Sequence, residues 1–121
     1  MTYSIILRDA ATGELGVAVQ TAWPMVGAVV PWVACGIGAV ATQSFAEIAY
    51  GPRLLDRLRA GEAPDDALAA QLAADGEAAT RQVAVMDAAG RAAAHTGASC
   101  VASAGHATAG GISCQANMME R

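Results

Sequence analysis

The sequence predicts an α+β domain in which two antiparallel sheets stack on each other and helices pack outside them. Three observations predict this class: β-prone segments open and close the chain, two helix-like segments lie between them, and strands do not alternate with helices. A length of 121 residues fits one domain. We therefore assign residues 1–121 to a single domain.

The first third of the chain predicts two pairs of strands. Residues 2–7 and 15–21 are β-prone and flank a turn at residues 9–13. The apolar segments Val26–Val33 and Ile37–Thr42 predict a second pair. We expect the inter-sheet core to contain small side chains, because alanine supplies much of the 55% hydrophobic fraction and aromatic residues only 4%.

The middle of the chain changes to a helical period. A helix is expected from about Pro52, with Leu54, Leu55 and Leu58 on one face and Gly61 after its end. A second helix begins at Pro64, where two aspartates occupy the positive first turn.

Strands return in the last third. We predict strands at Val83–Met86, Arg91–Thr96 and Ile112–Asn117. The intervening stretch from Gly97 is rich in glycine, serine and alanine, and we interpret it as loop.

Composition excludes some classes of protein. The net charge is −4 and all seven basic residues are arginine, which argues against a nucleic-acid binder. The apolar run from Ala22 to Gln43 is broken by two prolines and three glycines, so it predicts buried strands and no membrane span. No signal peptide is recognised, and three widely spaced cysteines indicate unpaired, buried thiols in the cytoplasm.

Few residues carry a recognisable chemical motif. The chain has no phosphate-binding loop, dinucleotide fingerprint or serine-nucleophile elbow. Two histidines without clustered ligands predict neither a metal site nor a cofactor. His95 is interpreted as a surface residue, whereas His106, in a glycine-rich loop, is either a surface residue or a proton carrier near a ligand.

Polar residues on otherwise apolar strands are more informative. Thr2 and Ser4 alternate on one face, Thr21 and Thr42-Gln43 end two strands, and Ser113, Gln115 and Asn117 share a face of the last strand. These residues either satisfy backbone groups or converge at one end of the sandwich as a pocket.

Several ordered runs carry a family resemblance across the whole chain. They are Met1–Ile5 with Arg8-Asp9, Val26–Trp32, Gly36–Gln43, Tyr50–Pro52, Arg81–Val83, Gly90-Arg91, Thr96-Gly97, and Ala104–His106 with Ser113, Gln115, Asn117 and Met118. In this combination the sequence resembles the bacterial family catalogued as domain of unknown function 1028, which is grouped with the N-terminal-nucleophile (Ntn) hydrolases. Within the last run, Cys114 and Ala116 depart from the family's apolar residue and glycine.

The resemblance implies an Ntn-hydrolase-like αββα sandwich that hydrolyses a C–N bond of a small amide or peptide-type substrate. In such enzymes a threonine, serine or cysteine at the mature N-terminus attacks the carbonyl, and its own α-amine acts as base. Thr2 is the position that fits, after removal of Met1. Thr42, His106 and Asn117 are expected to line the substrate pocket.

Relatives continue beyond the equivalent of Arg121, so we expect a shortened domain that lacks the C-terminal part of the usual fold. A bare outer sheet face, or the free edge near residues 113–117, then predicts a homo-oligomer, specifically a twofold dimer. Two alternatives remain open: a non-catalytic module for small-ligand binding or assembly, and a half-domain that functions only when paired with another chain.

Overall fold

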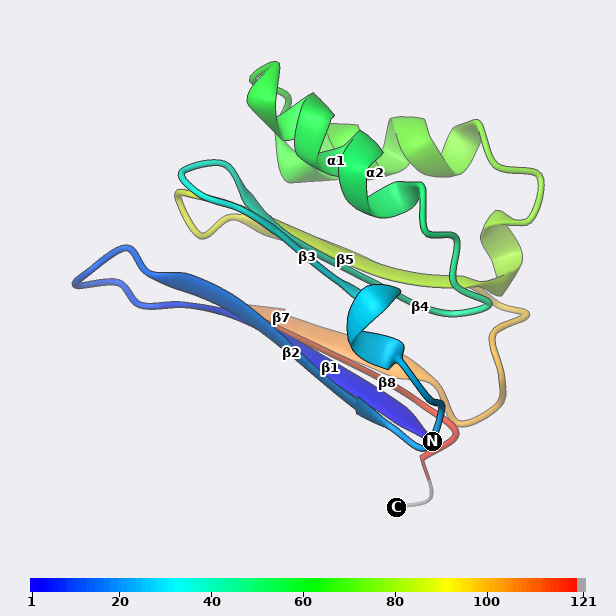
Figure 1. Ribbon diagram of the computed structural model, residues 1–121. Helices are drawn as coiled ribbons and strands as arrows, with labels where there is room; N and C mark the ends of the chain where they lie inside the picture. Colours follow the sequence, from blue (N-terminus) through cyan, green and yellow to red (C-terminus); the bar gives the residue numbers. More distant parts are fainter. Residues whose placement is uncertain (120–121) are drawn as a thin grey trace.

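The computed structural model describes residues 1–119 and has three layers (Figure 1). Two four-stranded antiparallel sheets stack face to face, and two helices cover the outer face of one of them. The first sheet has the order β2-β1-β8-β7 and the second β3-β4-β5-β6. The strands are β1 (Thr2–Arg8), β2 (Leu15–Thr21), β3 (Pro31–Ala34), β4 (Gly38–Ser44), β5 (Arg81–Asp87), β6 (Ala92–Thr96), β7 (Gly105–Ala109) and β8 (Ile112–Asn117). The predicted α+β class, with two stacked antiparallel sheets and helices on one outer face, is confirmed.

The helical layer consists of α1 (Tyr50–Arg59) and α2 (Pro64–Ala73), with short 3₁₀ turns at η1 (Val26–Ala28) and η2 (Ala78–Thr80). Leucines of both helices are buried against Val40, Val83 and Val85 of the second sheet. Gly61, with φ of 92°, links the two helices as predicted. Each long helix has ten residues, and across residues 1–119 no helix is both long and apolar enough to cross a membrane.

The β1–β2 hairpin forms as predicted and places the N-terminus at one end of the sandwich. Asp9 Oδ1 accepts the backbone N–H groups of Ala11 at 2.7 Å and Thr12 at 2.9 Å, which holds the turn. Gly13 takes a φ of 76° there. In-register pairing then sets Thr2 opposite Thr21 on β2 and opposite Asn117 on β8.

The strand predicted over Val26–Val33 is wrong in its first half. The backbone N–H groups of Val29 and Val30 both donate to the Val26 carbonyl at 3.0 Å, so this segment forms η1, and β3 begins only at Pro31. Three valines favour a strand by composition, but Met25, with φ of 59°, turns the chain into the 3₁₀ turn.

Strand β7 was not predicted from its composition. Glycine and alanine give it a weak β propensity, and it forms because Gly111, with φ of 74°, permits a tight reversal onto β8. His106 therefore lies on an edge strand, and the interpretation of its surroundings as a loop is wrong.

The two sheets meet through small side chains. Ile6, Val30 and Met86 are the larger members of a core completed by Ala39, Ala41 and Ala84. The expectation of small, alanine-rich side chains in the core is confirmed between the sheets.

The outer face of the first sheet has no covering layer in residues 1–119 (Figure 1). Cross-strand pairing puts Tyr3, Ile5 and Leu7 of β1 on this face, beside Ile112, Cys114 and Ala116 of β8. Tyr3, Leu7 and Ile112 are 40%, 46% and 39% exposed. All three cysteines are free, but Cys35 and Cys114 are exposed, so the prediction of uniformly buried thiols is wrong.

Candidate functional site

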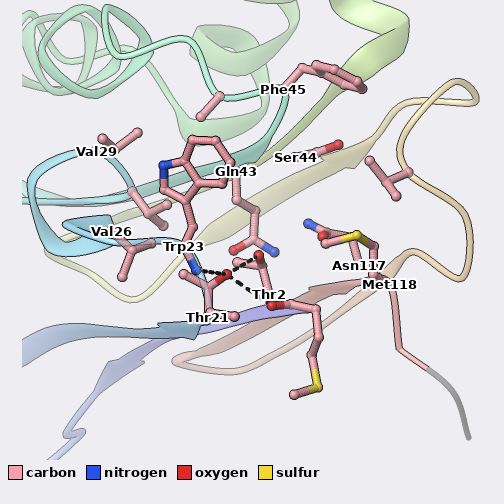
Figure 2. A pocket seen from close by; sticks show the side chains of 15 residues that line it. Thr2, Thr21, Trp23, Val26, Val29, Gln43, Ser44, Phe45, Asn117 and Met118 are labelled. Atoms are coloured by element: carbon pink, nitrogen blue, oxygen red, sulfur yellow. Dashed lines mark hydrogen bonds between the residues drawn. The ribbon is translucent and has the colours of Figure 1, made fainter.

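A pocket of about 570 Å³ lies at the end of the sandwich where β1 begins and where β2, β4 and β8 end (Figure 2). Its wall combines polar groups from the strand ends with apolar groups from η1 and the loop after β4. The lining residues are Met1, Thr2, Thr21, Ala22, Trp23, Val26, Val29, Val30, Gln43, Ser44, Phe45, Ala46, Val101, Asn117 and Met118. A pocket of this volume is large enough for a small molecule.

The Thr2 hydroxyl belongs to a short hydrogen-bond chain in this wall. Thr21 Oγ1 donates to the Met1 carbonyl at 3.0 Å and accepts the backbone N–H of Trp23 at 3.3 Å. A hydroxyl has one hydrogen, so the 2.9 Å contact between Thr2 and Thr21 has Thr2 as its donor. Figure 2 shows this chain converging on Thr21.

Asn117 lies beside Thr2 in the same sheet, Gln43 lies on the other sheet, and Gln82 joins the two amides. Asn117 Nδ2 donates to Gln82 Oε1 at 3.0 Å, and Gln43 Nε2 donates to the same oxygen at 2.8 Å. All three amides are at most 1% exposed. These hydrogen bonds hold the side chains of Gln43 and Asn117 in place, because a buried amide that loses its partner is unfavourable. The amide network therefore orients the polar wall of the pocket.

Thr42 and His106 do not line this pocket. Thr42 is fully buried on the opposite face of β4, toward α1, where its hydroxyl donates to the Glu47 carbonyl at 3.4 Å. His106 is exposed on β7 and shares a 2.8 Å hydrogen bond with Thr96 Oγ1 through its Nδ1. Of the four residues predicted for the site, the structure thus brings together Thr2 and Asn117.

An ion pair behind the pocket holds the loop that follows β4. Arg81 donates to Asp75 at 2.8 Å and to the carbonyl of Phe45, a pocket residue, at 2.7 Å. The Arg81 hydrogen bond lowers the pKa of Asp75 to about 2, and the same bond raises the pKa of Arg81. Burial, reinforced by a hydrogen bond to Asp75 at 2.9 Å, raises the pKa of the Tyr50 phenol. Asp75 is therefore ionised at neutral pH and keeps Arg81 on the loop.

No charged side chain lines the pocket, and no cluster of three histidine, cysteine, aspartate or glutamate residues suited to a metal ion occurs within residues 1–119. The site's chemistry is that of hydroxyl and amide groups. Hydroxyls supply a nucleophile when a base is present, and amides orient a polar ligand.

Sequence patterns missed Trp23, Ser44 and Phe45 as pocket residues. Ser44 takes φ of 69°, a left-handed conformation that turns the chain away from the strand period. Gln43 is predicted as a strand-end residue. The signal that it belongs to a site is its position as a polar residue in β4, a strand that is otherwise buried on both faces.

Fold and pocket together define an α+β protein with two stacked sheets and an uncharged pocket at the strand ends. The model of a family of unknown function, DUF1028, matches residues 2–121, and the chain belongs to this family. The crystal structure of protein SPO2555 from Silicibacter pomeroyi, assigned to the same family model, is similar with a TM-score of 0.95 and 33% identity. The similarity covers 99% of this chain and 54% of that one, so this chain spans about half the length of that protein. Among curated proteins, none matches.

Proposed function

We propose that the chain is an Ntn-type hydrolase that cleaves a C–N bond of a small amide, with Thr2 as its nucleophile. The observation that carries this proposal is the position of Thr2: it is the first residue of β1, and its hydroxyl lies in the wall of the pocket beside Asn117. One methionine precedes it, and removal of Met1 would place an α-amine next to that hydroxyl.

In the proposed reaction the α-amine of Thr2 takes the hydroxyl proton as Oγ1 attacks the amide carbonyl. The amine then gives this proton to the departing nitrogen, which leaves an ester on Thr2. Water hydrolyses the ester, releases the acid and restores the hydroxyl. A free α-amine has a pKa of about 7.7–8.0, so a substantial fraction is neutral near pH 8.

Neighbouring groups support this role. Removal of Met1 also removes the carbonyl to which Thr21 donates. The Thr21 hydroxyl can then donate to Thr2 Oγ1, which leaves the Thr2 proton for the α-amine. Asn117 Nδ2 uses one hydrogen on Gln82, and its second is available for the negative oxygen that develops in the reaction.

Two measurements test the proposal. Intact mass of untagged protein should be lower than the full sequence by one methionine residue. Release of free amine from a panel of small neutral amides should be lost in Thr2→Ala and largely kept in Thr2→Ser. Thr108→Ala, an exposed threonine on β7, is the matched control and should behave as wild type. Full activity in folded Thr2→Ala would refute the proposal.

The second candidate is a non-catalytic pocket that binds a small molecule. It is favoured by the lining of the pocket, where residues 1–119 place hydroxyl, amide and apolar side chains and no charged side chain that could act as a base. Retained Met1 in the intact mass, together with ligand binding unaffected by Thr2→Ala, would support this candidate over the hydrolase.

The proposed Ntn-hydrolase-like fold has a second helical layer that residues 1–119 do not contain. The bare face of the first sheet is where that layer would lie. We propose that a second copy of this chain covers it in a twofold dimer. The twelve outward positions of the four strands carry no charge, so two copies meet without like-charge repulsion. The three free thiols fit a cytoplasmic location.

A further inference from the structure

One buried oxygen in the pocket wall lacks a hydrogen-bond donor. Gln43 is 1% exposed and lines the pocket, and its Nε2 is used on Gln82. Its Oε1 is buried and has no partner within residues 1–119. Leaving a buried acceptor unpaired is costly, about 1–3 kcal/mol. An unpaired acceptor at a pocket wall can take a hydrogen bond from a donor that enters the pocket, either a water or a ligand N–H.

The orientation of this amide is fixed by its neighbours. Gln82 Nε2 lies 3.0 Å from the Gly105 carbonyl and 2.9 Å from the Ala116 carbonyl. Carbonyls only accept, so Gln82 must present its nitrogen to them and its oxygen to Gln43. If the Gln43 amide were turned around, its Oε1 would lie 2.8 Å from Gln82 Oε1, and two acceptors do not form a hydrogen bond. Gln43 must therefore keep Oε1 on its unpaired side, and in Figure 2 the end of its side chain points from β4 toward Thr2.

The rest of the wall restricts the ligand further. Among residues 1–119 no charged side chain lines the pocket, so an ionic ligand would lose hydration without gaining a side-chain counter-charge. Trp23, Val26 and Phe45 give the wall an apolar part. Ser44 Oγ, a second buried group without a partner in residues 1–119, is a hydroxyl that can donate to a carbonyl.

We propose that the pocket recognises an uncharged primary or secondary carboxamide, whose N–H donates to Gln43 Oε1 and whose apolar substituent packs on the Trp23 side. Gln43 is thus the residue that selects an N–H donor. The inference rests on the proposed function in that it names the substrate class for the same pocket, and it concerns binding alone.

The test is calorimetric titration with three probes of similar size: phenylacetamide, N,N-dimethylphenylacetamide, which has no N–H, and phenylacetate, which is charged. The Thr2→Ala protein is used so that hydrolysis plays no part. Phenylacetamide should bind about 3- to 10-fold more tightly than the dimethyl amide, as expected for one hydrogen bond. Phenylacetate should bind more weakly than phenylacetamide.

The variant Gln43→Met, made in the same background, should abolish the preference for the N–H probe while keeping a cooperative thermal transition. Gln71→Met is the matched control: it changes a buried glutamine of α2 outside the pocket, and it should keep the preference. Equal binding of the two amides, a preference that survives Gln43→Met, or no binding of phenylacetamide overturns the inference. Failure of hydrolysis in the protein with Thr2 intact, with the binding preference present, refutes only the proposed function.

Discussion

Gln82 is the residue on which the polar end of the sandwich depends, and its replacement is the most direct test of that structure. It is fully buried on β5, its Oε1 accepts from Gln43 and Asn117, and its Nε2 contacts Thr96 Oγ1 at 3.0 Å and two backbone carbonyls. Gln82→Met keeps the approximate size of the side chain and removes all of these hydrogen bonds. The buried amide nitrogens of Gln43 and Asn117 then lose their acceptor.

Each buried donor left without an acceptor costs about 1–3 kcal/mol, so two of them predict a loss of about 2–6 kcal/mol in the free energy of unfolding. Urea titration at neutral pH measures this loss from the shift in midpoint at constant slope. The control is Gln20→Met on β2, which is exposed and should change stability by less than about 0.5 kcal/mol. A Gln82→Met protein within about 1 kcal/mol of wild type would show that the network does not stabilise the fold.

Three further predictions concern the helical layer, the ion pair and association. Gly51→Ala should destabilise by about 1–3 kcal/mol in urea titration, because a Cβ there would lie 2.3 Å from the Trp32 ring, whereas Gly16→Ala meets nothing within 4 Å and serves as control. Asp75 has its pKa lowered to about 2 from 3.8, so its contribution of about 1–2 kcal/mol is complete above the unfolded pKa and is lost as pH falls toward 2. The stability difference between wild type and Asp75→Asn should therefore shrink between about pH 5 and pH 2, and a constant difference would contradict the assignment. Wild type should sediment as a dimer at low micromolar concentration and Leu7→Glu as a monomer, and a monomeric wild type would refute the proposed interface.

The architecture could be predicted because it depends on local signals that agree with one another. The leucines of α1, the proline that opens α2 and the turn at Asp9–Gly13 each specify one element, and the order of elements restricts their packing. The two errors occurred where tertiary contacts override composition. Val26–Val30 has strand composition and forms a turn, and β7 has loop composition and forms a strand because β8 pairs with it.

The site was less predictable because a strand's two faces differ by one residue. Thr42 and Gln43 end the same strand, and nothing in their own chemistry indicates which of them faces the other sheet. The period of β4 decides it: Ala39 and Ala41 pack between the sheets, whereas Val40 packs beneath the helices. Alternation then assigns Gln43 to the pocket and Thr42 to the helical side. That assignment requires knowing that helices cover only one of the two sheets, which no local pattern specifies.

The same reasoning explains why Thr2 and Asn117 meet. Each lies at the end of its strand, and they are separated by almost the whole chain, so no sequence motif connects them. They are opposite each other because β1 and β8 pair antiparallel in the register Thr2↔Asn117, Ser4↔Gln115 and Ile6↔Ser113. The Ser4 hydroxyl donates to Gln115 Oε1 at 2.8 Å on the face that points between the sheets. Because Ser4 and Gln115 are opposite each other on β1 and β8, this hydrogen bond favours the observed register. A slip of one residue would turn Asn117 and Gln115 onto the bare outer face and place Ala116 and Cys114 in the core. The buried polar pairs of β1 and β8 therefore determine the pocket, since they hold the first and last strands in the one register that brings Thr2 beside Asn117.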